Sequence, residues 1–115
     1  MMIDYKFREQ ELIEEFKKYI DSTYEQHYSQ NKFQSTEVII DRGHGTGFCM
    51  GNVDKYTNRY GKKGNHTDAR KDLMKILHYA LIQLYVHDEE KRKAVEHATQ
   101  RAQKIEDNPG WSRED

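Results

Sequence analysis

The sequence contains few of the residues that cross-link or interrupt a chain. It has one cysteine, Cys49, one proline and one tryptophan among 115 residues. A single cysteine excludes an internal disulfide and favours a reducing compartment. No apolar run approaches the roughly 18 residues of a membrane span, and the N-terminal MMIDYKFREQE lacks a signal-peptide core. We therefore expect a cytoplasmic protein with no membrane partner.

Apolar residues are also scarce. Hydrophobic residues make up 35% of the chain and charged residues 34%, so little apolar volume is available for a core. We expect one helical domain over residues 1–115. We also expect a homo-oligomer, because self-association would let two copies share a core.

Hydrophobic periodicity predicts an all-α fold of four to five helices. A first helix is expected over about 4–25, and HYSQNKFQ is interpreted as a break. A short helix from Ser35 or Thr36 then carries the triplet 38–40, with a short strand as the alternative. A third helix is expected over 46–60 and a fourth from Thr67 or Asp68 to about Val86. Residues 88–107 are expected to form a solvated helix or an oligomerisation arm, ended by NPG.

Glycine and positive charge coincide in one part of the sequence. Six of the seven glycines lie between residues 43 and 64, and residues 42–75 carry eight Lys or Arg against three Asp or Glu, a local charge of +5. The net charge of the whole chain is only −1, which disfavours binding to duplex nucleic acid and favours a focused anion site. Gly61 and Gly64 are expected to adopt positive φ where the third helix ends.

The favoured interpretation is a phosphate cradle made of glycine N–H groups and of Lys and Arg side chains at helix ends. Its candidate residues are Gly45, Gly47, Asn52, Lys55, Tyr56, Arg59, Lys62, Lys63, Lys71 and Lys75. His44 lies between glycines and is the candidate acid–base catalyst. The alternative is that the glycines form ordinary turns and the cations are solvated. Arg59→Ala is expected to weaken anion binding without changing helicity or assembly.

Other kinds of site have weaker signals. The histidines form no HxxxH or HExxH pair, and Cys49 falls on the packing face of its helix, so no metal–histidine site and no thiol nucleophile is expected. Carboxylates of two helices could converge to hold Mg²⁺, as in helical pyrophosphohydrolases. Their residues would be Glu11, Glu14 and Glu15 with Asp68 and Asp72.

Three segments carry a resemblance to a known family: HYSQNKFQSTEVI, GFCMGNVDKYTNRYGKKG and DARKDLMKILHYALIQL. They resemble the SaV-like family of small phage proteins over about residues 27–85. One relative of that family is the metal-independent nucleotide kinase of T-odd coliphages, which phosphorylates deoxynucleoside monophosphates. The motif positions are His27, Tyr28, Gly51, Asn52, Lys55, Tyr56, Arg59, Gly61, Lys63, Asp72, Leu73 and Lys75.

The resemblance implies a phage origin, a helical fold and a nucleotide-related role. We therefore expect a phage-encoded nucleotide-binding protein in the cytoplasm of an infected bacterium, with a nucleoside monophosphate kinase-like activity as the implied chemistry and no cofactor. Whether turnover occurs stays open at this point. The alternatives are a Mg²⁺-dependent nucleoside triphosphate pyrophosphohydrolase, a non-catalytic nucleotide sponge and a plain interaction protein.

Overall fold

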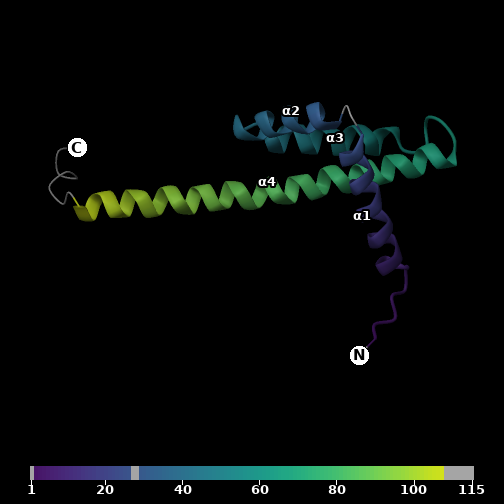
Figure 1. Cartoon of the computed structure of the whole chain (residues 1–115), viewed down its shortest axis with the longest axis horizontal. Helices are drawn as coiled ribbons and strands as arrows, with labels where there is room; N and C mark the ends of the chain where they lie inside the picture. The colour runs from purple at the N-terminus through teal and green to yellow at the C-terminus, as the bar shows by residue number, and fades with distance from the viewer. Residues whose placement is uncertain (1, 27–28, 108–115) are drawn as a thin grey trace.

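The computed structural model describes residues 2–26 and 29–107, and within them it consists of four helices joined by short connections. In chain order these are α1 (Glu9–Glu25), α2 (Ser29–Asp41), α3 (Gly45–Arg59) and α4 (His66–Asp107) (Figure 1). The all-α prediction is confirmed. None of the described helices is long and apolar enough to cross a bilayer.

The helices α3 and α4 form an antiparallel hairpin that organises the rest of the chain (Figure 1). Gly61 and Gly64 have φ values of 75° and 80° in the connection, as predicted, because the chain must reverse within a few residues. Asn65 and Asp68 then exchange hydrogen bonds, each side chain accepting from the other's backbone N–H at 3.0 Å. This reciprocal cap satisfies two N–H groups at the start of α4.

Buried residues mark the seam between these two helices. Cys49 and Tyr56 on α3 are buried, as are Tyr79 and Val86 on α4. At the far end Gly45 is buried so closely that a Cβ atom there would lie 3.0 Å from a methyl carbon of Val86. The close approach fixes the register of the hairpin at this end, since no larger residue fits without a shift.

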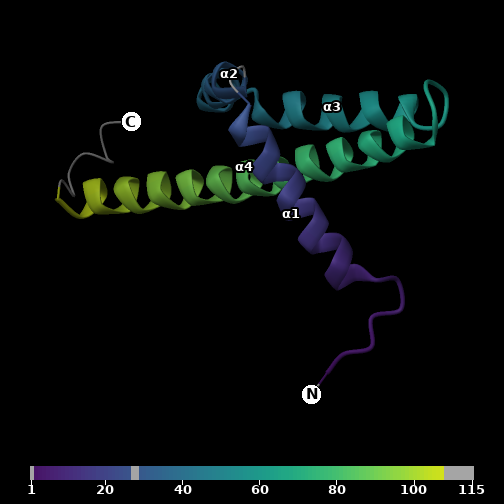
Figure 2. The ribbon, with the colours of Figure 1, turned by 45° about the vertical axis from the view of Figure 1, so that its right-hand side comes forward.

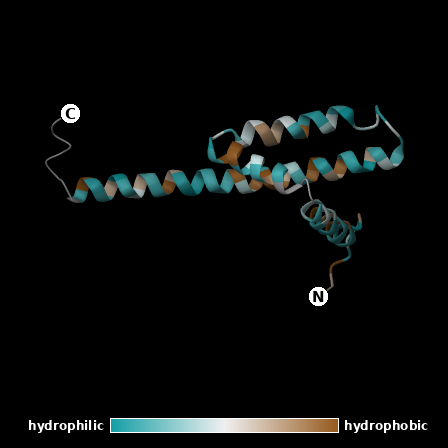
Figure 3. Cartoon of the chain, turned by 45° about the horizontal axis from the view of Figure 1, so that its top comes forward, coloured by the Kyte–Doolittle hydropathy of each residue, from teal (hydrophilic) through white to brown (hydrophobic). Residues whose placement is uncertain are grey.

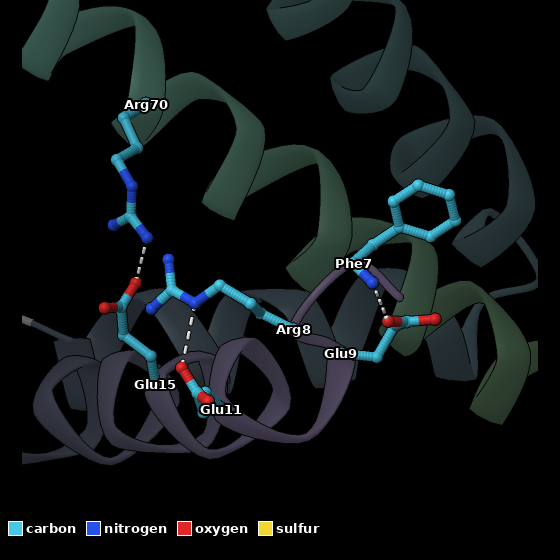
Figure 4. A network of polar contacts seen from close by, with 6 residues as sticks. All are labelled: Phe7, Arg8, Glu9, Glu11, Glu15 and Arg70. Atoms are coloured by element: carbon cyan, nitrogen blue, oxygen red, sulfur yellow. Dashed lines mark hydrogen bonds and ion pairs between the residues drawn. The ribbon is translucent and has the colours of Figure 1, made fainter. Parts of the chain in front are cut away.

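The helices α1 and α2 complete the cluster on one side of the hairpin. Figures 1 and 2 show α2 beside α3, and α1 crossing α4 before it projects away from the other helices. The rings of Tyr24 and Phe33 stack at 4.4 Å and join α1 to α2. Glu15 of α1 also pairs with Arg70 of α4 (Figure 4). The first half of α1 contributes no buried residue.

Two helices begin at other residues than predicted. The first helix starts at Glu9 and not near Asp4, because Arg8 adopts φ 58° and the Glu9 carboxylate accepts a 2.7 Å hydrogen bond from the N–H of Phe7 (Figure 4). The second helix starts at Ser29, so the predicted break at residues 29–31 is wrong. Short polar residues such as Ser and Asn suit the beginning of a helix as well as a turn.

The fourth helix continues without interruption from His66 to Asp107, well beyond the predicted end near Val86. Its second half holds no glycine or proline and is rich in strong helix formers. It extends past the end of α3 as a single rod that is mostly hydrophilic (Figures 1 and 3). Every residue from 91 to 106 is exposed. The expected stop at residues 108–110 lies outside the described residues.

The contact between Gly45 and Val86 generates a stability prediction. Gly45→Val should lower the free energy of unfolding by about 1–3 kcal/mol, because the added methyl groups must displace Val86 or Ile40. Urea unfolding followed by circular dichroism measures the change. Gly47→Ala is the matched control, since its Cβ would meet nothing within 4 Å and alanine favours the helix. Equal stability of Gly45→Val and the native protein would show that the seam is looser than described.

Candidate functional site

A pair of stacked tyrosines lies at the centre of the hairpin seam. The rings of Tyr56 on α3 and Tyr79 on α4 are 6.0 Å apart with an interplanar angle of 11°. Both residues are buried, with 9% and 8% of their surface exposed. Phe48 meets Tyr79 edge-on at 5.9 Å. These rings form a rigid apolar wall between the two helices.

Three cations surround the ring of Tyr56. The Nζ atoms of Lys55 and Lys75 lie 5.1 Å and 5.0 Å from the ring centroid, and the guanidinium carbon of Arg59 lies at 6.0 Å. Attraction between each cation and the ring quadrupole holds these side chains near one another despite their like charge. The helices α3 and α4 thereby concentrate positive charge at one place.

A fourth cation comes from α2. The Nζ of Lys32 lies 5.7 Å from the centroid of Tyr79, so the two tyrosines share four cations between them. Lys32 and Lys75 both line a cavity of about 260 Å³ between α1, α2 and the hairpin. No aspartate or glutamate lines this cavity, which is enclosed by Tyr19, Ser22, Thr23, Gln26, Lys32, Phe33, Thr36, Tyr56, Lys75, His78, Tyr79 and Ile82. We call it the lysine cavity.

A second, more apolar cavity adjoins the lysine cavity. It has a volume of about 470 Å³ and shares four lining residues with it: Phe33, Thr36, His78 and Ile82. Its other walls include Ile20, Ile40 and Leu81, with Glu37 and Asp41 of α2 also in the lining. We call it the apolar cavity. The two together form a groove that is basic in one half and apolar, with two carboxylates, in the other.

One of the cations also has a structural partner. The Nε of Arg59 lies 3.4 Å from Oδ1 of Asp72, whose side chain is only 1% exposed, whereas that of Arg59 is 40% exposed. Within the described residues, neither carboxylate oxygen of Asp72 has a hydrogen-bond partner. The carboxylate therefore depends on Arg59 for compensation of its charge, since an unpaired buried charge is costly. Arg59 stabilises the hairpin as well as contributing charge to the site.

This pairing changes what Arg59→Ala should do. We now expect that substitution to lower the free energy of unfolding by about 1–3 kcal/mol, because it leaves Asp72 buried and unpaired. The penalty should shrink when Asp72→Asn is already present, and a double-mutant cycle by urea unfolding measures the difference. Lys62→Ala is the control, since Lys62 is exposed and its side chain donates a 3.0 Å hydrogen bond to the side-chain oxygen of Asn58, four residues earlier. A penalty that is unchanged in the Asp72→Asn background would contradict the pairing.

His78 sits where the two cavities meet and is surrounded by aromatic rings. The ring centroids of Phe16 and Tyr19 on α1 lie 6.4 Å and 6.0 Å from that of His78, in edge-to-face arrangements. The ring centroid of Phe33 on α2 lies 6.2 Å from it. Burial lowers the pKa of His78 below its ordinary value of 6.5, and the charge of Lys32 lowers it further. His78 is therefore held neutral at physiological pH, where it can donate one hydrogen bond and accept another.

The lowered pKa of His78 generates a pH prediction. The unfolded chain titrates His78 near 6.5 and the folded chain titrates it lower, so the unfolded state binds more protons between the two values. Stability should therefore fall as pH drops through 6.5 and level off below the folded pKa. Thermal unfolding between pH 8 and 5 measures this, and His78→Phe keeps the aromatic packing without the titration. An identical pH dependence in His78→Phe would exclude His78 as the source.

Four of the predicted phosphate-binding residues are brought together by the structure. Lys55, Tyr56, Arg59 and Lys75 meet at the tyrosine pair. Asn52 is one turn before Tyr56 on the same helix, where its side-chain amide donates a 2.9 Å hydrogen bond to the carbonyl of Phe48. Of the motif positions, His27 and Tyr28 lie outside the described residues.

The remaining predicted residues lie elsewhere. His44 and Gly45 are at the other end of α3, with His44 about 16 Å along the helix from Lys55. Gly45 packs against Val86, and Gly47 lies in the same first turn of α3. Lys62 and Lys63 are exposed in the connection after α3, and Lys71 lies on the side of α4 that faces α1. Within one subunit, Gly45 and Gly47 therefore do not lie beside Lys55 and Lys75 at the tyrosine pair.

The structure also supplies three site residues that the sequence reasoning missed: Lys32, His78 and Tyr79. Lys32 was placed in a break between helices, so no helical face was assigned to it. Tyr79 follows Asp72 by seven residues, which is the heptad spacing of a helix seam. That spacing could have identified Tyr79 as a partner for the buried face of α3.

Three of the five carboxylates proposed for Mg²⁺ have other roles in this arrangement. Glu15 pairs with Arg70, Asp68 caps α4, and Asp72 pairs with Arg59 inside the hairpin. Among the described residues, no group of three or more His, Cys, Asp or Glu side chains is placed to hold a metal ion. Burial raises the pKa of the Cys49 thiol, which fits its position in the core.

Comparison with known proteins gives one match. A family described as a protein of unknown function, DUF3310, matches residues 22–81, more than half of the chain. The chain belongs to the DUF3310 family. The DUF3310 segment contains α2, α3 and the first part of α4, and so includes all the residues that line the lysine cavity except Tyr19 and Ile82. No curated protein and no solved structure matches significantly.

Proposed function

We propose that this DUF3310 protein binds a nucleotide in the groove formed by the lysine cavity and the apolar cavity. The observation that carries the proposal is the lysine cavity itself, where Lys32 and Lys75 enter from different helices and no carboxylate lines the wall. Two cations on the wall of a partly apolar cavity, with no carboxylate in its lining, attract an anion, because the apolar side chains beside them reduce screening by water.

The phosphate groups would occupy the lysine cavity. Lys32 and Lys75 supply direct charge, and Lys55 and Arg59, which lie near the Tyr56 ring but do not line the cavity, add to the positive field. Neutral His78 offers a hydrogen bond at the junction of the two cavities. Packing of Tyr56 against Tyr79 does not require four cations near the two rings. Their presence favours a binding role for at least Lys32 and Lys75, which line the lysine cavity.

The nucleoside would occupy the apolar cavity. Aromatic and aliphatic side chains such as Tyr24, Phe33 and Ile40 provide surface for a base. The carboxylates of Glu37 and Asp41 can accept hydrogen bonds from sugar hydroxyls or from a base amino group. The apolar cavity contains carboxylate acceptors, whereas the lysine cavity has cations and no carboxylate. This combination suits a nucleotide, which has a nucleoside at one end and phosphate at the other, better than it suits inorganic phosphate.

The phage origin and the kinase-like chemistry implied by the SaV-like resemblance remain part of this proposal. Phosphoryl transfer without a Walker loop would depend on positioning and on neutralisation of charge by Lys and Arg. His44, at the start of α3, lines neither cavity and lies about 16 Å along the helix from Lys55, so it is not placed beside the phosphate-binding lysines of its own subunit. A non-catalytic nucleotide sponge uses the same groove, and a turnover assay with nucleoside monophosphates and ATP separates the two.

Binding should depend on the two cavity lysines. Isothermal titration with nucleoside mono-, di- and triphosphates should show binding without Mg²⁺, and Lys32→Ala or Lys75→Ala should each weaken it about tenfold through loss of a charged contact. Lys62→Ala and Lys93→Ala are matched controls with the same change of charge at exposed positions.

Three outcomes would contradict the proposal. Equal weakening by all four alanine variants would indicate a diffuse charge effect. Binding that requires Mg²⁺ would favour the pyrophosphohydrolase. The third is the absence of both a heat of binding and a rise in melting temperature with any nucleotide at millimolar concentration. It would show that the lysines bind no nucleotide, since a ligand that binds the folded state must raise its stability.

A further inference from the structure

The second half of α4 is unsupported by the rest of the described chain. Val86 packs on Gly45 at the end of α3, and Glu90 accepts a 3.3 Å hydrogen bond from the hydroxyl of Thr46; beyond Glu90 the helix extends past α3 to Asp107 (Figure 1). The radius of gyration is 20.6 Å, against about 13 Å for a compact domain of this length. The accessible surface is 9714 Å², against roughly 6,600 Å² for a compact monomer of this mass. An isolated helix of this kind is marginal in water.

An apolar stripe runs along the face of α4 opposite to α3. Its large members are 45–59% exposed: Leu77, Leu81, Leu84, Val95 and Ile105. Together with exposed alanines they follow an alternating spacing of three and four residues, which is the heptad seam of a coiled coil. The complete stripe is Leu77, Leu81, Leu84, Asp88, Lys91, Val95, Ala98, Ala102 and Ile105.

Two charged residues interrupt the middle of this stripe. Asp88 and Lys91 occupy consecutive seam positions, and no ion pair within the described residues involves either of them. An unrelated apolar helix packed on the stripe would bury both charges without partners, at considerable cost. The occupant must therefore supply a cation opposite Asp88 and an anion opposite Lys91.

A second copy of α4 running antiparallel meets this requirement. With the two-fold axis between Glu89 and Glu90, Asp88 of each copy lies opposite Lys91 of the other. The same register sets large residues against small ones, because an isologous contact repeats each pairing twice. Leu84 meets Val95 and Leu77 meets Ala102. Leu81, which also lines the apolar cavity and is 45% exposed, meets Ala98.

A parallel arrangement fits the stripe poorly. It would set Asp88 against Asp88 and Lys91 against Lys91, which is repulsive at buried seam positions. It would also stack leucines on leucines in one half and alanines on alanines in the other, leaving the alanine half with little contact. Charge and side-chain volume thus select the same orientation independently.

We propose that two copies of this protein associate through an antiparallel coiled coil of their α4 helices, centred between Glu89 and Glu90. The contact extends over residues 77–102, a length of roughly 39 Å. The helix that is unsupported in one subunit becomes half of the shared core in the pair. The face of the overhang that carries His97, Arg101 and Lys104 stays in solvent.

Charge exchange tests the central pair by sedimentation equilibrium. Asp88→Lys and Lys91→Asp should each raise the dimer dissociation constant at least about tenfold, by placing like charges in contact. An equimolar mixture of the two variants, and the double variant Asp88→Lys/Lys91→Asp, should both restore association to within about threefold of the native value. Lys93→Glu, on the solvent face, should have no effect.

Cysteine cross-linking tests the orientation, and buried Cys49 does not interfere. Under mild oxidation a mixture of Leu84→Cys and Val95→Cys chains should form a covalent heterodimer, whereas Leu84→Cys alone should not cross-link. A monomeric native protein, a covalent Leu84→Cys homodimer or a double charge exchange that fails to restore association would each overturn the proposal. Circular dichroism of every variant reports whether helicity itself has changed.

Discussion

The packing of α3 against α4 is the interaction on which the rest of the structure depends. At one end of the hairpin Val86 packs against Gly45, and in the middle Tyr56 stacks on Tyr79. At the other end Arg59 forms an ion pair with Asp72. Each contact needs the same antiparallel register, so a shift of one helical turn would break all three. Because α1 and α2 touch each other and the hairpin mainly through aromatic side chains, their positions follow from that register.

The candidate site is a direct consequence of this seam. Stacking the two tyrosines brings the lysines of α3 and α4 to one ring, and packing α2 on the hairpin adds Lys32 to the other. Within the part of the chain that the structure describes, Asp72 is the only buried carboxylate and it compensates Arg59, while no ion pair involves Lys32, Lys55 or Lys75. Among the described residues, the site is thus a place where four cations gather beside two buried tyrosines and only Arg59 has a carboxylate partner.

Prediction from the sequence succeeded where local chemistry decides the structure. Gly61 and Gly64 adopt positive φ as expected, because the reversal of the chain between two helices is decided by the residues of the turn itself. It failed where the outcome depends on contacts far apart in sequence. The sequence around Lys32 does not indicate that Lys32 contacts Tyr79. Position 45 needs a glycine because Val86 packs closely against it, and not because a ligand binds there. The uninterrupted length of α4 was missed because its second half buries nothing within the chain.

The central claim is that the lysine cavity and the apolar cavity together hold a nucleotide. An amide chemical-shift titration with a nucleoside monophosphate tests it most directly, since it locates the ligand without any substitution. The account predicts that the largest shifts fall in residues 32–41 and 75–82, which line the groove from α2 and α4. Shifts concentrated instead at residues 61–64 would contradict it, because they would place the ligand at the turn between α3 and α4 and leave the groove empty.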